Sequence, residues 1–165
     1  MLRAVWRQEE GTPEAVLKWM SDMYGESGEV AEMEFCELWT ARTFSMAKTA
    51  FEMIGRSVEE ETGKEVAGKE FCYIDYLRDS DLGPVGVVRV KSMEVSTPDW
   101  GEVLGVMAEG MQEFVMSHYR VVWPVCADHK CGLHVGFFHE TAVWTCKAGI
   151  TSGHVVRAID PAVRL

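Results

Sequence analysis

Potential metal ligands are concentrated at one end of this 165-residue chain. All five histidines and three of the five cysteines fall within its last 48 residues. They form two short clusters, Cys126-Ala-Asp-His129 with Cys131 close behind, and Cys146 followed after seven residues by His154. A Cys-x-x-His turn directs two ligand atoms toward a common point that a tetrahedral metal ion can occupy. A segment this short cannot bury a full hydrophobic core, so a metal ion would supply the stability that it lacks.

The residues between the two clusters predict a β-hairpin. Residues 133–138 and 141–145 read as two strands joined by a turn at His139 and Glu140, and residues 154–159 read as another short strand. The hairpin would return the chain to the first cluster, and a glycine-containing loop would then carry the last histidine into reach. We therefore predict a closed site with two thiolates and two imidazoles. Its ligands are Cys126, His129, Cys146 and His154.

Two other residues are substitutes for members of this set. Cys131 and His134 follow Cys126 with the spacing Cys-x4-Cys-x2-His, which also suits a metal site. We expect His139, at the hairpin tip, to be solvated, and His118, on the apolar stripe of a helix, to be packed. The competing interpretation needs no metal, because aromatic residues of this segment could form a small core with buried free cysteines. These aromatic residues are Trp123, Phe137 and Trp144.

The same segment carries a run of short motifs. It contains Trp-Pro-x-Cys-x-x-His, then Ala-Val-Trp-x-Cys, then Gly-His. The matching positions are Trp123, Pro124, Cys126, His129, Ala142, Val143, Trp144, Cys146, Gly153 and His154. The run resembles the zinc-ribbon-like tail of small, mostly uncharacterised proteins of high-GC bacteria and their phages, over Trp123–Ile159. The resemblance implies a small structural zinc site and no reaction. The chain departs from the family pattern at Cys131 and in the longer loop from Lys147 to Gly153.

Helical patterns dominate the first part of the chain. The first helix should begin at Thr12, which can cap it, with Pro13 at the first helical position. A second, longer helix is predicted from about Glu29 to Glu61, and Gly63 is expected to end it.

This long helix has two apolar stripes, which is more apolar surface than one packing face requires. Large exposed apolar patches usually mark interfaces, so we expect one stripe to be covered by another chain, either a second copy or a different protein. The residues predicted for this interface are Phe44, Phe51 and Val58.

The middle of the chain predicts a small sheet and a third helix. Residues 70–77 and 85–95 read as strands that could pair as an antiparallel hairpin. The third helix should be capped by Thr97, with Pro98 at its first position, and its apolar stripe ends at His118. The expected fold class is α+β. It comprises N-terminal helices, a small antiparallel sheet, a third helix and a C-terminal zinc-ribbon-like β-hairpin module.

Charge divides the chain where the metal ligands begin. Residues 1–118 carry 11 basic and 23 acidic side chains, a net charge of −12, whereas residues 119–165 carry five and three, a net charge of +2. We expect two domains with these bounds. Phosphate contacts need Lys and Arg, so nucleic-acid binding should be weak or absent and confined to the second domain. The cations of that domain are Arg120, Lys130, Lys147, Arg157 and Arg164.

Targeting signals are not recognisable in the sequence. No apolar run approaches the roughly 18 residues of a membrane span, and the first residues do not read as a signal peptide. An odd number of cysteines, several of them clustered, favours metal binding in a reducing compartment. We therefore expect the protein in the cytoplasm or incorporated into a phage particle.

The function that these features favour is non-catalytic, namely protein interaction or assembly with a structural zinc ion. No phosphate-binding glycine loop and no nucleophile elbow is present in the sequence. Three alternatives remain: a nucleic-acid-associated zinc-ribbon factor, an acidic protein that mimics nucleic acid, and a metal-dependent nucleotide hydrolase. The carboxylates that the hydrolase would need are Glu26, Glu29, Glu32, Glu59, Glu60 and Glu61.

Overall fold

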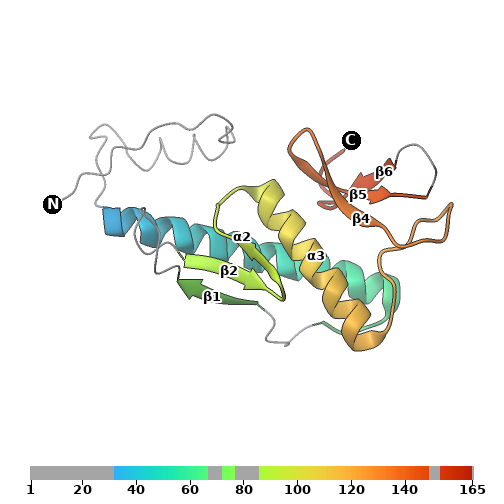
Figure 1. The fold of residues 1–165 in the computed structure, drawn as a ribbon, viewed down its shortest axis with the longest axis horizontal. Helices are drawn as coiled ribbons and strands as arrows, with labels where there is room; N and C mark the ends of the chain where they lie inside the picture. Colours follow the sequence, from blue (N-terminus) through green and yellow to red (C-terminus); the bar gives the residue numbers. More distant parts are fainter. Residues whose placement is uncertain (1–31, 67–71, 77–85, 149–152, 165) are drawn as a thin grey trace.

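The computed structural model describes residues 32–66, 72–76, 86–148 and 153–164. Within these ranges the chain forms two helices and two three-stranded antiparallel sheets, so the α+β class is confirmed (Figure 1). The helices are α2 (Glu32–Thr62) and α3 (Trp100–Tyr119). The helix predicted to begin at Thr12 lies outside the described residues.

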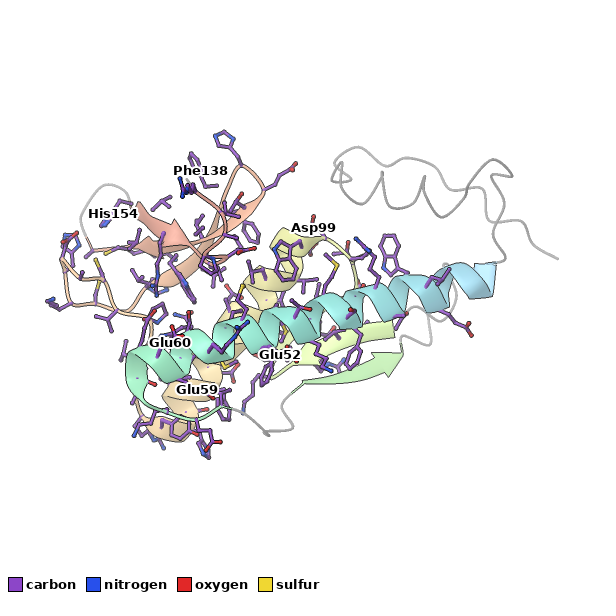
Figure 2. The ribbon with its side chains drawn as sticks, turned by 180° about the vertical axis from the view of Figure 1, so that it is seen from behind. Glu52, Glu59, Glu60, Asp99, Phe138 and His154 are labelled. Carbon is purple, nitrogen blue, oxygen red and sulfur yellow. The ribbon has the colours of Figure 1, made fainter. Side chains whose placement is uncertain are left out.

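Helix α2 follows the predicted long helix closely. Its C-terminal end is set by Gly63, which adopts a φ of 67° and donates its N–H to the carbonyl oxygen of Glu59 at 2.9 Å. Only glycine adopts this left-handed conformation without steric cost, so the predicted stop is confirmed. Small side chains dominate the buried face of α2, whereas Glu52 and Glu60 are exposed (Figure 2). The buried residues are Thr40, Thr43, Ala47, Ala50, Ile54, Gly55 and Val58.

The first sheet contains three strands instead of the predicted two. They are β1 (Cys72–Tyr76), β2 (Gly86–Val90) and β3 (Met93–Val95), in that order. The predicted antiparallel pairing of the first two strands is confirmed. The prediction of a single strand over residues 85–95 is wrong. Lys91 adopts a φ of 56° and reverses the chain, so this stretch forms the two paired strands β2 and β3. Ser92 stabilises this turn by donating to Glu113 Oε2 of α3 at 3.0 Å.

Helix α3 begins two residues later than the sequence predicts. Asp99, not Thr97, caps it, because its Oδ1 accepts the N–H of Glu102 at 2.7 Å. Pro98 is buried immediately before this cap. The indole nitrogen of Trp100 donates to Asp160 Oδ2 at 3.1 Å, which ties the first turn of α3 to the C-terminal segment.

The second sheet contains the predicted hairpin. Its strands are β4 (His134–Phe138), β5 (Thr141–Cys146) and β6 (His154–Ala158), with β5 in the centre. His139 and Glu140 form the turn with φ values of 45° and 62°. Two left-handed residues in succession match the twist of a two-residue hairpin, so the predicted turn is confirmed. The register between β5 and β6 shifts at Trp144 and Thr145.

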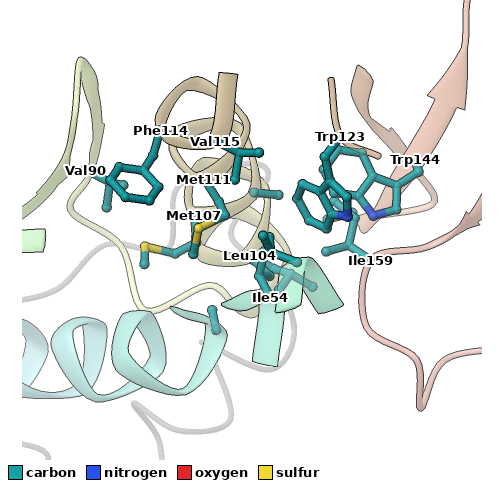
Figure 3. Packing of buried hydrophobic residues seen from close by; sticks show 14 of the residues in the cluster. Ile54, Val90, Leu104, Met107, Met111, Phe114, Val115, Trp123, Trp144 and Ile159 are labelled. Atoms are coloured by element: carbon teal, nitrogen blue, oxygen red, sulfur yellow. The ribbon is translucent and has the colours of Figure 1, made fainter. Parts of the chain in front are cut away.

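Helix α3 packs against both sheets, and its glycines permit the close approach. A Cβ atom added at Gly110 would lie 2.3 Å from Val90 Cγ1 on β2, and one added at Gly101 would lie 2.3 Å from the carbonyl oxygen of Glu140 at the β4–β5 turn. Figure 3 shows Val90 on one side of α3 and Trp123 and Trp144 on the other.

One cluster of buried side chains therefore joins the two regions of the chain. It extends from Ile54 of α2 through Met107 and Met111 of α3 to Trp123 and Ile159 (Figure 3). The predicted division into residues 1–118 and 119–165 stays a prediction. Among the described residues, no helix has both the length and the apolar character to cross a bilayer.

Candidate metal centre

The structure brings the four predicted ligands together. One ligand atom from each of Cys126, His129, Cys146 and His154 lies within 4.8 Å of all the others. In the described part of the chain, this is the group of His, Cys, Asp and Glu side chains that could hold a metal ion. The two residues of each cluster are separated by short stretches of backbone, so the geometry of each stretch decides where its ligands point.

The first cluster lies on a closed turn between two paired backbone segments. Cys126 donates its N–H to the carbonyl oxygen of Cys131 at 2.8 Å, and its own carbonyl oxygen accepts the N–H of Lys130 at 2.9 Å. Lys130 adopts a φ of 55°, which lets the chain reverse here. The N–H of Leu133 then donates to the carbonyl oxygen of Pro124 at 2.8 Å. These bonds hold His129 on the same side of the turn as Cys126.

The second cluster lies where β5 ends and β6 begins. Cys146 is the last residue of β5 and is the register partner of His154, the first residue of β6. Gly153 lies against the backbone of Cys146, because an added Cβ atom would be 2.7 Å from the Cys146 carbonyl oxygen. The pairing of the two strands therefore places the second thiol and the second imidazole side by side.

The ligand atoms of His129 and the two cysteines are close to contact. His129 Nδ1 lies 3.6 Å from Cys126 Sγ and 3.4 Å from Cys146 Sγ. The rings of His129 and His154 have centroids 5.4 Å apart. Both cysteines are buried, with 1% and 0% exposure, whereas both histidines are exposed. The centre therefore has a buried thiol side and a solvent-facing imidazole side.

The predicted substitutes have different positions. Cys131 is half-buried, and its Sγ lies 3.5 Å from Cys146 Sγ, yet it does not belong to the four-residue group. His134 is exposed on β4 opposite Thr145 and does not belong to the group either. The structure therefore assembles the preferred ligand set and leaves Cys131 directly beside it.

The two remaining histidines lie away from the centre. His139 is exposed at the hairpin tip, as predicted. The prediction that His118 is packed in the interior is wrong, because His118 is exposed. Its ring instead stacks on the ring of Phe114, one helical turn earlier, with centroids 5.2 Å apart.

A glutamine that the sequence analysis did not single out supports the first cluster. Gln112 of α3 donates its side-chain amide to the carbonyl oxygens of Trp123 at 3.1 Å and Leu133 at 2.8 Å. These two carbonyls belong to the segments on either side of the Cys126 turn. No motif could have identified Gln112, because its partners are backbone atoms that only the folded chain brings to α3.

The predicted interface residues differ in burial. Phe44 is 38% exposed and Phe51 is half-buried. Val58 is fully buried in the chain's own core, contrary to its predicted place in an interface, because the C-terminal half of α2 packs into the cluster around α3. The apolar stripe is therefore covered at one end of α2 and exposed at Phe44, and an interface at Phe44 and Phe51 stays a prediction.

Two of the carboxylates considered for a hydrolase make structural contacts. Glu59 Oε1 accepts the N–H of Val66 at 3.0 Å. Glu61 accepts the indole N–H of Trp123 at 3.1 Å and pairs with Arg157. The third carboxylate of this run, Glu60, is exposed (Figure 2). Glu26 and Glu29 lie outside the described residues, as does the side chain of Glu32.

No protein-family model, no curated protein and no solved structure matches this chain. The resemblance of Trp123–Ile159 to zinc-ribbon-like tails stays a prediction.

Proposed function

We propose that this chain is a non-catalytic interaction or assembly protein whose C-terminal region is stabilised by a structural zinc ion. The observation that carries the proposal is that four ligand atoms lie within 4.8 Å of one another. They come from the Cys126 turn and from the β5–β6 pair, and the first cysteine of each, Cys126 and Cys146, are 20 residues apart along the chain. Two thiolates and two imidazoles are ligands that Zn²⁺ prefers.

The spacing of the ligand atoms suits zinc. A tetrahedral ion with Zn–S of about 2.3 Å and Zn–N of about 2.0 Å holds sulfur and nitrogen about 3.5 Å apart. The distances from His129 Nδ1 to the sulfurs of Cys126 and Cys146 are 3.6 and 3.4 Å. These two distances are close to those of a tetrahedral zinc site, so they support zinc as the ion that His129 and the two cysteines would hold.

A structural role follows from the number of ligands. Four protein ligands fill every position of a tetrahedral ion, whereas catalytic zinc sites keep one position for water or substrate. Such an ion would join the Cys126 turn directly to the β5–β6 pair, beside the packing of Trp123 on Trp144 within the buried cluster.

An interaction role is supported by apolar side chains of α2 that are exposed in the described part of the chain. Leu38 is 40% exposed and Phe44 is 38% exposed, in the half of the helix that precedes the buried Val58. We propose a protein partner or a second copy at this half of α2, in a cytoplasmic complex or in a phage particle. Nucleic acid is a poor partner for a surface with the net charge of −12 that residues 1–118 carry.

The test of the zinc site is metal analysis of the purified chain and of paired variants. We expect about one zinc per chain, and we expect His154→Ala and Cys146→Ser to lose it. His134→Ala is the matched control, since His134 is also an exposed histidine at the start of a strand but lies outside the ligand group. Metal-free wild-type protein with unchanged stability, or equal metal loss in the His134 and His154 variants, would contradict the proposal.

A further inference from the structure

Cys146 lies between two alternative partners. Its Sγ is 3.4 Å from His129 Nδ1, inside the candidate metal centre, and 3.5 Å from the Sγ of Cys131, outside it. One sulfur cannot serve both partners, because a sulfur in a disulfide is no longer the thiolate that binds a metal. Cys146 therefore cannot be a metal ligand and a disulfide partner at the same time.

Cys131 is the thiol of this group that solvent reaches most easily. It is half-buried, whereas Cys126 and Cys146 are buried. Its backbone is held at the end of the Cys126 turn, because its carbonyl oxygen accepts the N–H of Cys126 at 2.8 Å. A small oxidant that arrives from solvent therefore meets Cys131 first, with Cys146 next to it.

We propose that the metal centre is sensitive to peroxide: Cys131 and Cys146 form a disulfide, and the loss of Cys146 as a ligand releases the metal ion. This inference rests on the proposed function, since it assumes that the four-residue group holds a metal. The two sulfurs are about 1.5 Å farther apart than in a disulfide, so the cross-link requires the two side chains to approach each other by that distance.

The chemistry balances with hydrogen peroxide as the two-electron oxidant. The Cys131 thiol attacks one peroxide oxygen and becomes a sulfenic acid, and the other oxygen leaves as water. The Cys146 thiolate then attacks the sulfenic sulfur, and the hydroxide that leaves takes a proton from solvent to form a second water. Two electrons pass from the two sulfurs to the peroxide, and the metal ion leaves with its charge unchanged.

The experiment treats the full-length, metal-loaded protein with a small molar excess of hydrogen peroxide. Released metal is followed with a coloured chelator, and disulfides are mapped by mass spectrometry of a non-reduced digest. We expect metal release and a Cys131–Cys146 cross-link to appear together. Reduction followed by added zinc should restore both the thiols and the metal content.

A variant separates Cys131 from the ligands. Cys131→Ser should keep its metal as purified, because the four-residue group stays intact, and should release it about tenfold more slowly under peroxide. Cys72→Ser is the matched control, because Cys72 lies on β1 of the other sheet, and it should release metal at the wild-type rate.

The outcomes that overturn the inference differ from those that overturn the proposed function. If the purified wild-type protein contains no metal, both the proposed zinc site and this inference are overturned. Metal-loaded protein that gives no Cys131–Cys146 cross-link, or that keeps its metal after the cross-link has formed, removes the inference and leaves the zinc site standing. Metal loss from Cys131→Ser before any peroxide is added would make Cys131 a ligand, which also overturns the inference and not the metal binding.

Discussion

The indole nitrogen of Trp123 donates a hydrogen bond to Glu61 Oε2 across 3.1 Å. The other carboxylate oxygen of Glu61 pairs with Arg157 Nη2 at 2.5 Å. Glu61 belongs to the last turn of α2, Trp123 precedes the Cys126 turn, and Arg157 lies on β6. One carboxylate thus joins the end of α2 both to the segment that leads into the Cys126 turn and to strand β6, which begins at the candidate ligand His154.

Removal of this carboxylate should weaken the fold without changing the ligand set. We expect Glu61→Ala to lower the free energy of unfolding by about 1 kcal/mol, because a partly buried indole N–H and an arginine lose a charged acceptor. Urea denaturation of the metal-loaded protein measures this. The matched control is Glu60→Ala, since Glu60 is an exposed glutamate of the same helical turn, as Glu61 is, and it should change stability by less than about 0.5 kcal/mol. Equal effects of the two variants would show that the contacts of Glu61 add nothing.

Two helical glycines should respond to the same substitution in opposite directions. In Gly110→Ala the new methyl group would meet Val90 Cγ1 at 2.3 Å, so we expect a loss of about 2 kcal/mol from overpacking between α3 and β2. In Gly55→Ala the nearest atom is Val66 Cβ at 3.8 Å, an ordinary contact, so the better helix propensity of alanine should add about 0.5 kcal/mol. Thermal unfolding of both variants gives the comparison, and a stabilised Gly110→Ala protein would contradict the close packing of α3 on β2.

Gly153 should control metal affinity although it is not a ligand. An alanine there would place its Cβ atom 2.7 Å from the carbonyl oxygen of Cys146, so the chain must shift just before His154. We expect Gly153→Ala to bind zinc about tenfold more weakly in a competition titration with a chelator. Gly132→Ala is the control, because its Cβ atom would meet only the end of the exposed Val122 side chain. Unchanged affinity in Gly153→Ala would mean that His154 contributes little to the site.

Self-association through α2 is tested at Phe44. If a second copy covers this residue, Phe44→Ser should raise the dissociation constant of the dimer by about tenfold or more in sedimentation experiments, because a partly buried aromatic anchor is lost. Phe137→Ser is the control, since Phe137 is a more exposed phenylalanine on β4. A wild-type chain that stays monomeric at high concentration would exclude a second copy and leave a different protein as the partner.

The convergence of these four side chains could be predicted because its geometry is local. Cys126 and His129 share one turn, and a two-residue hairpin turn with polar residues brings Cys146 back to it. The long periodic stripe of α3 was equally informative. The first residue of that helix could not be predicted, because Thr97 and Asp99 are both good capping residues. Asp99 is the cap in the folded chain because it accepts the N–H of Glu102, while the hydrogen bond from Trp100 to Asp160 fixes the first turn of the helix.

Other features depend on contacts that no local pattern encodes. The turn at Lys91 contains no glycine or asparagine, so residues 85–95 read as one strand. Val58 has the same heptad position as Phe44, and only the packing of α2 on α3 buries one and leaves the other exposed. Gln112 and Glu61 bind partners that are far away in sequence, which is why their roles appear only in the folded chain.

The unequal burial of the four side chains makes the two faces of the candidate metal centre different in how easily a competing ligand reaches them. Its sulfurs are anchored in the protein interior, and its two imidazoles border the water. When an ion occupies this candidate centre, a competing chelator or an acceptor protein would therefore displace His129 and His154 first, while both sulfurs remain bound to the ion. Exchange of the metal can begin in this way without opening the core around Trp123 and Trp144, so the rate of metal transfer should follow the concentration of the acceptor and not the rate of unfolding.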